Sequence, residues 1–175
     1  MAISKRIIQF LDSKGIDYRI DHHRPAHSAQ DLAATEHVTG YCVAKTVVCI
    51  ADGEPAILVL PAPMEVDFAR VCEELEASEA RLAYPDEIRG IFPDSVEGMA
   101  PPPLPLWEGV TVYADATITN TDEVVFAAGT LRDAIWMSCA DWLSLACPVI
   151  CDFVRAPVST DDWSDAMTIE VVSQT

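Results

Sequence analysis

One lysine in an apolar segment is the residue of this sequence best placed to do chemistry. Lys45 stands in the run Val43 to Ile50, where the other residues are apolar except Thr46. It is also the only lysine after residue 14, although lysine is normally among the commonest residues. Burying an ammonium without a partner costs several kcal/mol. Lys45 therefore either extends from the end of a strand to solvent or binds an anion, and the pattern alone favours neither.

Two glycines lie where a backbone could approach a ligand. Gly98 begins a proline-rich segment that ends at Pro105, and glycine followed by rigid proline can hold free backbone N–H groups towards a ligand. On spacing alone, a simple connection is the better interpretation of this segment. Gly129 follows the apolar run Val124 to Ala127 and indicates either a β-bulge or a close approach of a ligand to the backbone.

Histidines and cysteines gather without forming a metal-binding pattern. His23 and His27 are four residues apart, but Pro25 between them is incompatible with the helix that would align their rings. Cys147 and Cys151 have the same spacing, no histidine pair completes a zinc set, and we interpret both as small buried hydrophobic residues. Neither a Gly-x-Ser-x-Gly motif nor a glycine-rich phosphate loop is present. We therefore predict no metal, no other cofactor and no side-chain nucleophile.

The charge balance restricts the partners of the chain. There are 28 acidic and 11 basic residues, which gives a formal net charge of −17. This composition excludes a broad basic surface for nucleic acid, but it leaves room for a few well-placed cations. No apolar run reaches the roughly 20 residues that span a bilayer, and the first residues lack the apolar core of a signal peptide. We predict a cytoplasmic protein with no membrane contact.

Local patterns predict the elements that must position these residues. Helix caps and helical periodicity predict helices over residues 5–14, 29–36, 66–76 and 86–91, and from Ser138 towards Leu145. Apolar and β-branched runs predict strands over residues 18–21, 43–51, 56–60, 110–115 and 124–127. Asp52-Gly53 predicts a tight hairpin between the second and third strands.

The fold class follows from the order of these elements. Helices and strands do not alternate regularly, and the strands come partly as hairpins, so we predict an α+β fold with a mixed, largely antiparallel sheet and flanking helices. A chain of 175 residues has the size of one domain. We assign residues 1–157 to this domain and residues 158–175 to an acidic C-terminal tail.

Six short segments share their order and spacing with one known family. They are Ala44-Lys45-Thr46-Val47-Val48, Val59-Leu60-Pro61-Ala62, Phe92-Pro93-Asp94, Gly98-x-x-Pro101, Val125-Phe126-Ala127-Ala128-Gly129-Thr130 and Ile135-x-Met137-Ser138-x-x-Asp141. With this combination, over about residues 4–155, the sequence resembles the YbaK/EbsC group of aminoacyl-tRNA deacylases. It is similar to the editing domain inserted in bacterial prolyl-tRNA synthetases.

The resemblance implies a barrel-like editing-domain fold and hydrolysis of the ester that joins a wrong amino acid to the 3′ end of a tRNA. It implies that the Lys45 ammonium lies near the terminal nucleotide, and that the Gly98 N–H polarises the ester carbonyl. Neither residue is a general base, because the substrate's own ribose hydroxyl or a substrate thiol assists the reaction. The resemblance further implies a substrate pocket lined by Thr46, Pro101, Ala128 and Gly129. A synthetase that presents the tRNA is a further expected partner.

The chain departs from the commonest family pattern beside these positions. Relatives commonly have Pro-Pro-Phe-Gly where this chain has Pro101-Pro102-Pro103-Leu104, and many have histidine where Leu131 stands. A rival interpretation is a binding module that keeps the pocket for a small aminoacyl-like ligand or a protein partner and no longer hydrolyses. The presence of both Lys45 and Gly98 favours the enzyme.

Overall fold

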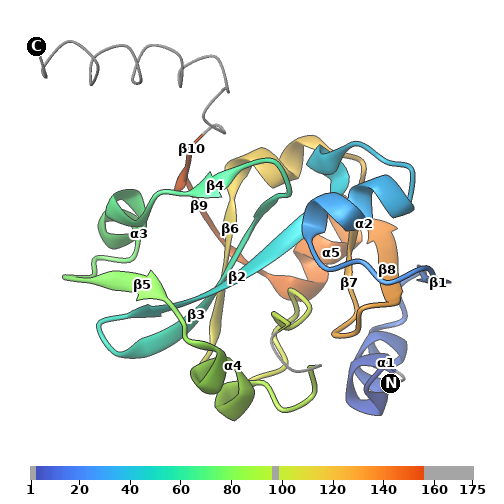
Figure 1. The fold of residues 1–175 in the computed structure, drawn as a ribbon, viewed down its shortest axis with the longest axis horizontal. Helices are drawn as coiled ribbons and strands as arrows, with labels where there is room; N and C mark the ends of the chain where they lie inside the picture. The colour runs from blue at the N-terminus through green and yellow to red at the C-terminus, as the bar shows by residue number, and fades with distance from the viewer. Residues whose placement is uncertain (1–2, 96–98, 156–175) are drawn as a thin grey trace, which may run out of the picture.

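Three β-sheets form the framework of the part of the chain that the structure describes, residues 3–95 and 99–155 (Figure 1). The structure is a computed structural model. The largest sheet has five strands in the order β5-β2-β3-β6-β9. Their bounds are β2 Ala44–Ala51, β3 Glu54–Pro61, β5 Ala80–Leu82, β6 Thr111–Asp115 and β9 Val149–Cys151.

Two smaller sheets complete the framework. A three-stranded sheet has the order β1-β8-β7, and a two-stranded sheet pairs β4 with β10. Their bounds are β1 Tyr18–His22, β7 Glu123–Ala127, β8 Asp133–Ser138, β4 Glu65–Val66 and β10 Val154–Arg155.

Helices cover the sheets. In Figure 1 α2 lies over the three-stranded sheet, where it contacts β7, while α5 contacts β7 and β8 and α3 contacts β5. The α-helices are α1 Lys5–Lys14, α2 Ala29–Thr35, α3 Phe68–Glu74, α4 Pro85–Ile91 and α5 Cys139–Ala146. Two short 3-10 helices, η1 Gly40–Cys42 and η2 Ala116–Asn120, lie in the connections.

The strand pairing confirms the predicted mixed, largely antiparallel α+β fold. The β3–β6 and β6–β9 pairs are parallel, and the other paired strands are antiparallel. Among the described residues the sheets do not close into a barrel. A single parallel bridge between Val43 and Val125 links the five-stranded sheet to the three-stranded one.

The predicted hairpin is present and places β2 and β3 at the centre of the larger sheet. Asp52 and Gly53 have φ of 48° and 85°, as a two-residue type I′ turn requires, and Ala51 pairs with Glu54. Successive residues of β3 then point into different cores. Ile57 belongs to the main core between the two larger sheets, whereas Leu58 belongs to a second cluster with α3. This double burial explains the continuous apolar sequence of the strand.

One predicted element needs correction, and one central strand was not predicted. The helix expected over residues 66–76 begins only at Phe68, because the side chain of Asp67 accepts hydrogen bonds from the next helical N–H groups and Val66 pairs with β10. Strand β8 has no counterpart among the predicted strands. It is the central strand of its sheet and is buried on both faces, so it lacks the alternation that identifies a half-buried strand.

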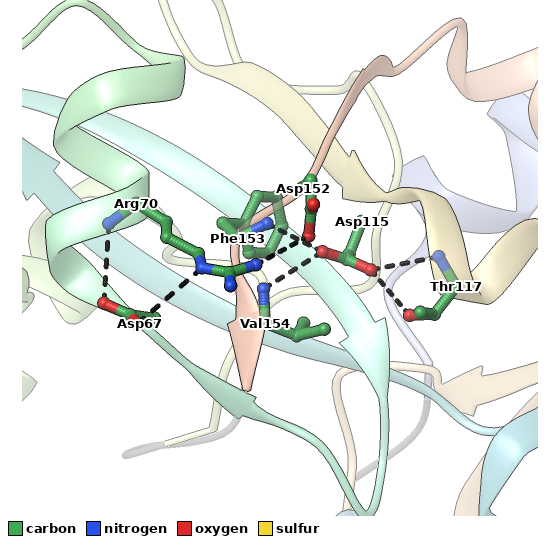
Figure 2. Close-up of polar contacts among 7 residues, drawn as sticks. All are labelled: Asp67, Arg70, Asp115, Thr117, Asp152, Phe153 and Val154. Atoms are coloured by element: carbon green, nitrogen blue, oxygen red, sulfur yellow. Dashed lines mark hydrogen bonds and ion pairs between the residues drawn. The ribbon is translucent and has the colours of Figure 1, made fainter. Parts of the chain in front are cut away.

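A buried carboxylate ties the end of the described chain to the larger sheet (Figure 2). Asp115, at the end of β6, is only 1% exposed. It accepts hydrogen bonds from the backbone N–H groups of Phe153 at 2.8 Å and Val154 at 3.1 Å, and from the hydroxyl of Thr117 at 2.6 Å. These bonds hold β10 in register beside β4.

Two sequence predictions lie outside the described residues. They are the acidic tail, residues 158–175, and the position of Gly98. Over the described ranges, no helix is long and apolar enough to cross a membrane.

Candidate active site

A pocket of about 240 Å³ opens where the two larger sheets approach each other. Four segments form its walls: the β1–α2 connection with the first turn of α2, the start of β2, residues 99–101, and the end of β7 with the following turn. Among the predicted site residues, Lys45, Thr46 and Pro101 line this pocket. Elements far apart in the sequence therefore bring three of the expected residues to one cavity.

The Lys45 side chain is half-buried and has protein partners. Its ammonium donates hydrogen bonds to the backbone carbonyls of Ala62 at 3.1 Å and Met64 at 2.5 Å. These carbonyls belong to the turn that follows β3, the strand paired with β2. Neither of the simple sequence interpretations describes this arrangement, because backbone dipoles solvate the charge at the rim of the sheet. An ammonium has three N–H donors, so one remains for a ligand.

The electrostatics of Lys45 combine two opposing effects. Burial lowers the pKa of the Lys45 ammonium below its ordinary value, and the nearby carboxylate of Glu65 partly opposes this shift. A partly desolvated cation interacts more strongly with an anionic or polar ligand than an exposed cation does. Lys45 is therefore suited to contact a phosphate, a hydroxyl or a carbonyl oxygen in the pocket.

Two of the predicted site residues lie elsewhere, and a third is outside the described residues. Ala128 is buried in the main core, and its N–H donates to the carbonyl of Asp133 at 2.9 Å. Gly129 does not line the pocket either. It has φ of 79° and packs against the chain at Asp94 and Ser95. Gly98 lies outside the described residues, while Met99 and Pro101, which follow it, line the pocket.

Sequence reasoning did not select Thr130 for the site, although it lines the pocket. Its hydroxyl donates to the buried carboxylate of Asp133 and accepts from the N–H of Arg132 at 3.2 Å. The other oxygen of Asp133 contacts Nδ1 of His22. Thr130 is thus held in place by a hydrogen-bonded network behind the pocket wall. The sequence offered one signal for including Thr130 in the site: it follows Gly129 in a segment that resembles the family.

Two histidines considered for metal binding also line the pocket. His23 and His27 lie on the β1–α2 connection. Within the described ranges, no group of three or more histidine, cysteine, aspartate or glutamate side chains is placed to hold a metal ion. The predicted burial of Cys151 is confirmed, but Cys147 is exposed because it is the residue with positive φ at which α5 ends.

Some cations of the described residues have no carboxylate partner, and one of them, Lys45, lines this pocket. Six of the 11 basic residues are arginines in ion pairs with aspartate or glutamate: Arg6, Arg19, Arg70, Arg81, Arg89 and Arg155. No ion pair of the described residues includes Arg24, which follows His23, or Arg132, which lies two residues after Thr130. Arg24 and Arg132 are exposed and do not line the pocket, so Lys45 is the only cation among the lining residues.

The departures from the commonest family sequence have roles in packing. Leu104 is fully buried in the main core, and the carbonyl of Pro103 accepts a hydrogen bond from the indole N–H of Trp142 at 3.0 Å. The carbonyl of Leu131 accepts the N–H of Ala26 at 2.8 Å, which joins two walls of the pocket. These residues hold the proline-rich segment and the β7–β8 turn against the rest of the molecule.

Comparison with known proteins identifies a family and a related protein. The model of the aminoacyl-tRNA editing domain matches residues 23–145. The "Multifunctional Ser/Thr-tRNA deacylase ProXp-y" of Escherichia coli K12 is 26% identical over 156 residues, which cover 86% of this chain and 92% of that protein.

Solved structures share the fold. The crystal structure of a hypothetical protein, APE2540, superposes with a TM-score of 0.78 at 18% identity and covers 86% of this chain and 100% of that one. A structure described as "a putative trans-editing enzyme for prolyl tRNA synthetase" gives a TM-score of 0.73 at 19% identity, covering 89% of this chain and 100% of that one.

Proposed function

Because this chain belongs to the aminoacyl-tRNA editing domain family, we propose that its pocket is the site at which mischarged aminoacyl-tRNA is deacylated. The protein is an ester hydrolase that edits in trans: it removes a wrong amino acid from the 3′ end of a tRNA. The observation that carries the assignment is the half-buried Lys45 ammonium, which lines the pocket and keeps one N–H donor beyond its two backbone partners.

The proposed chemistry needs no side-chain nucleophile. The free N–H of Lys45 binds the terminal nucleotide, and the backbone N–H of Gly98 donates to the ester carbonyl oxygen. Water attacks the carbonyl carbon, the N–H stabilises the resulting oxyanion, and the ribose oxygen leaves and takes up a proton. The roles of Lys45 and Gly98 are supported by the matching segments of the family and, for Lys45, by its position in the pocket.

A small amino acid is the proposed substrate. The pocket holds about 240 Å³, and alanines contribute much of its lining, including Ala26, Ala44, Ala100 and Ala127. The E. coli relative named a Ser/Thr-tRNA deacylase supports seryl or threonyl groups in particular. Recognition of the tRNA rests on its 3′ end and on Arg24 and Arg132, with a synthetase as the partner that presents the tRNA in the cytoplasm.

A deacylation assay over a panel of mischarged tRNAs tests this function. We expect hydrolysis of tRNAs that carry small amino acids. We expect less hydrolysis of those that carry large aromatic ones, because the pocket of about 240 Å³ must hold the ester and part of the terminal nucleotide together with the side chain. A folded protein that binds aminoacyl-adenosine analogues but hydrolyses no tRNA of the panel would establish a binding module instead. Full activity on aromatic aminoacyl-tRNAs would show that this pocket does not hold the amino acid.

A further inference from the structure

His23 lies in the wall of the pocket and has a ring nitrogen without a partner among the described residues. Its Nδ1 lies 2.6 Å from the backbone carbonyl oxygen of Arg24. A carbonyl oxygen only accepts, so Nδ1 must carry the proton, and in the neutral ring Nε2 is left with a free lone pair. The backbone N–H of His23 also donates to the carbonyl of Arg132 at 2.8 Å, which fixes the residue between two walls of the pocket.

The Nε2 atom of His23 is buried, and no described residue forms a hydrogen bond with it. Buried polar atoms are nearly always paired in native proteins, and leaving one unpaired costs about 1–3 kcal/mol. His23 lines the pocket, so a bound ligand can supply the missing donor. An acceptor kept unsatisfied in an otherwise small, alanine-rich cavity is the feature expected of a specificity determinant.

Two neighbouring hydroxyls in the pocket already have hydrogen-bond partners within the protein. The hydroxyl of Thr130 already donates to Asp133 and accepts from Arg132, and the hydroxyl of Ser28 accepts the helix-capping bond from the N–H of Asp31 at 3.0 Å. Lys45 supplies only donors. The start of β2 therefore contributes the donor, Lys45, and the β1–α2 connection, in another wall of the pocket, contributes the acceptor, His23.

We propose that Nε2 of His23 accepts a hydrogen bond from the side-chain hydroxyl of the bound amino acid, which makes His23 the residue that selects seryl and threonyl over alanyl groups. This inference rests on the proposed function. If Lys45 holds the terminal nucleotide from the start of β2, the side chain of the amino acid extends towards the other wall. A site built to pair with a hydroxyl discriminates strongly against an analogue that lacks it, because its own polar atom then stays unpaired.

The test compares three substrates in the unmodified protein and in variants at positions 23 and 37. Single-turnover deacylation of seryl-, threonyl- and alanyl-tRNA is measured for the unmodified protein, for His23→Asn and for His37→Asn. The asparagine amide at position 23 can still donate to the carbonyl of Arg24 but removes Nε2. His37 is a matched control, because it is exposed, lies outside the pocket and has φ of 57°, which asparagine tolerates well.

For His23→Asn, we expect seryl and threonyl deacylation to fall at least about tenfold, equivalent to roughly 1.4 kcal/mol, while alanyl deacylation changes less than about threefold. His23→Gln, which places an amide oxygen near the position of Nε2, should restore part of the loss. Equal losses for all three substrates would overturn the selective role, as would unchanged rates. His37→Asn should match the unmodified protein.

A binding measurement separates this inference from the proposed function. Calorimetric titration uses non-hydrolysable seryl- and alanyl-amide analogues of the terminal adenosine. We expect the unmodified protein to prefer the seryl analogue at least about fivefold, which is close to 1 kcal/mol, and His23→Asn to lose this preference. A seryl preference without hydrolysis of any tRNA would keep the His23 assignment and reject the deacylase. Hydrolysis of mischarged tRNA without a preference for the seryl analogue would keep the deacylase function and reject the His23 assignment.

Discussion

The ammonium of Lys45 serves the fold and the proposed site at once. It bridges the carbonyls of Ala62 and Met64 in the turn after β3 and also lines the pocket. A lysine with this double role is not replaceable by a surface cation, because both the length of its side chain and its charge are used. The two roles can be separated by measuring activity and stability in the same variant.

The first prediction concerns the charge of Lys45. Replacement Lys45→Met keeps the aliphatic stem and removes the ammonium, so kcat/KM for the best substrate should fall at least about tenfold, or roughly 1.4 kcal/mol. Loss of the two carbonyl contacts should cost about 1–2 kcal/mol of unfolding free energy, measured by urea denaturation. Lys14→Met, on exposed α1 surface, is the control. Unchanged kcat/KM in a folded Lys45→Met protein would remove Lys45 from the site.

Gly129 allows a second prediction at this scale. Its φ of 79° disfavours any residue with a side chain, and an added Cβ would lie 3.6 Å from the carbonyl of Asp94 and 3.7 Å from Ser95. Gly53→Ala is a matched control, because Gly53 has φ of 85° and open space around the same position. Both substitutions should lower the unfolding free energy by about 1–2 kcal/mol. Only Gly129→Ala should also lower kcat/KM, because it alone contacts the segment that leads to Gly98. Equal kcat/KM values for Gly129→Ala and Gly53→Ala would show that the packing of Gly129 against residues 94 and 95 does not affect the site.

At the scale of elements, segments far apart in the sequence are held together by buried polar groups as well as by apolar packing. The Asp115 carboxylate joins the end of β6 to residues 153 and 154 (Figure 2). Asp133 plays the corresponding part behind the pocket, where it joins His22 of β1 to Thr130. These carboxylates accept several hydrogen bonds each, so they contribute to register as well as to stability.

The third prediction tests the first of these carboxylates. In Asp115→Asn an amide NH₂ replaces one oxygen and faces N–H donors, so the variant should lose about 2–3 kcal/mol of unfolding free energy in urea denaturation. Asp152→Asn is the control, because Asp152 is 73% exposed and its ion-pair partner within the described ranges is the half-exposed Arg70. That change should cost less than about 1 kcal/mol. Equal losses for the two variants would show that the buried contacts of Asp115 carry no special weight.

At the scale of the whole molecule, the acidic surface and the tRNA substrate are in conflict. With a net charge of −17, long-range electrostatics oppose the approach of a nucleic acid. Most arginines are neutralised by neighbouring carboxylates. Among the described residues, Lys45 lines the pocket, and Arg24 and Arg132 take part in no ion pair. Binding must therefore depend on the 3′ end of the tRNA and on the amino acid more than on the body of the tRNA.

The fourth prediction follows from this small number of cations. Three phosphate contacts would give a logarithmic dependence of tRNA affinity on salt with a slope of about 2 to 3 in magnitude. The replacement of Arg24 and Arg132 by serine should reduce this slope by about 1 to 2, whereas Arg70→Ser should leave it unchanged. Titrations of charged tRNA at several salt concentrations measure the slope. A slope that corresponds to roughly six or more phosphate contacts would reveal a basic surface that these residues do not explain.

The sequence by itself determined the features that depend on a few neighbouring residues. Asp52-Gly53 specifies its turn because glycine and aspartate tolerate positive φ, and the apolar run of β2 predicts a central strand in which Lys45 stands out. The tertiary structure alone decided which side chains meet. The carbonyl partners of Lys45, the approach of His23 and Thr130 to one pocket, and the burial of Ala128 in the core depend on pairing between distant strands. The local periodicity of apolar residues predicts whether one face of an element is buried, but it does not identify the segment that packs against that face.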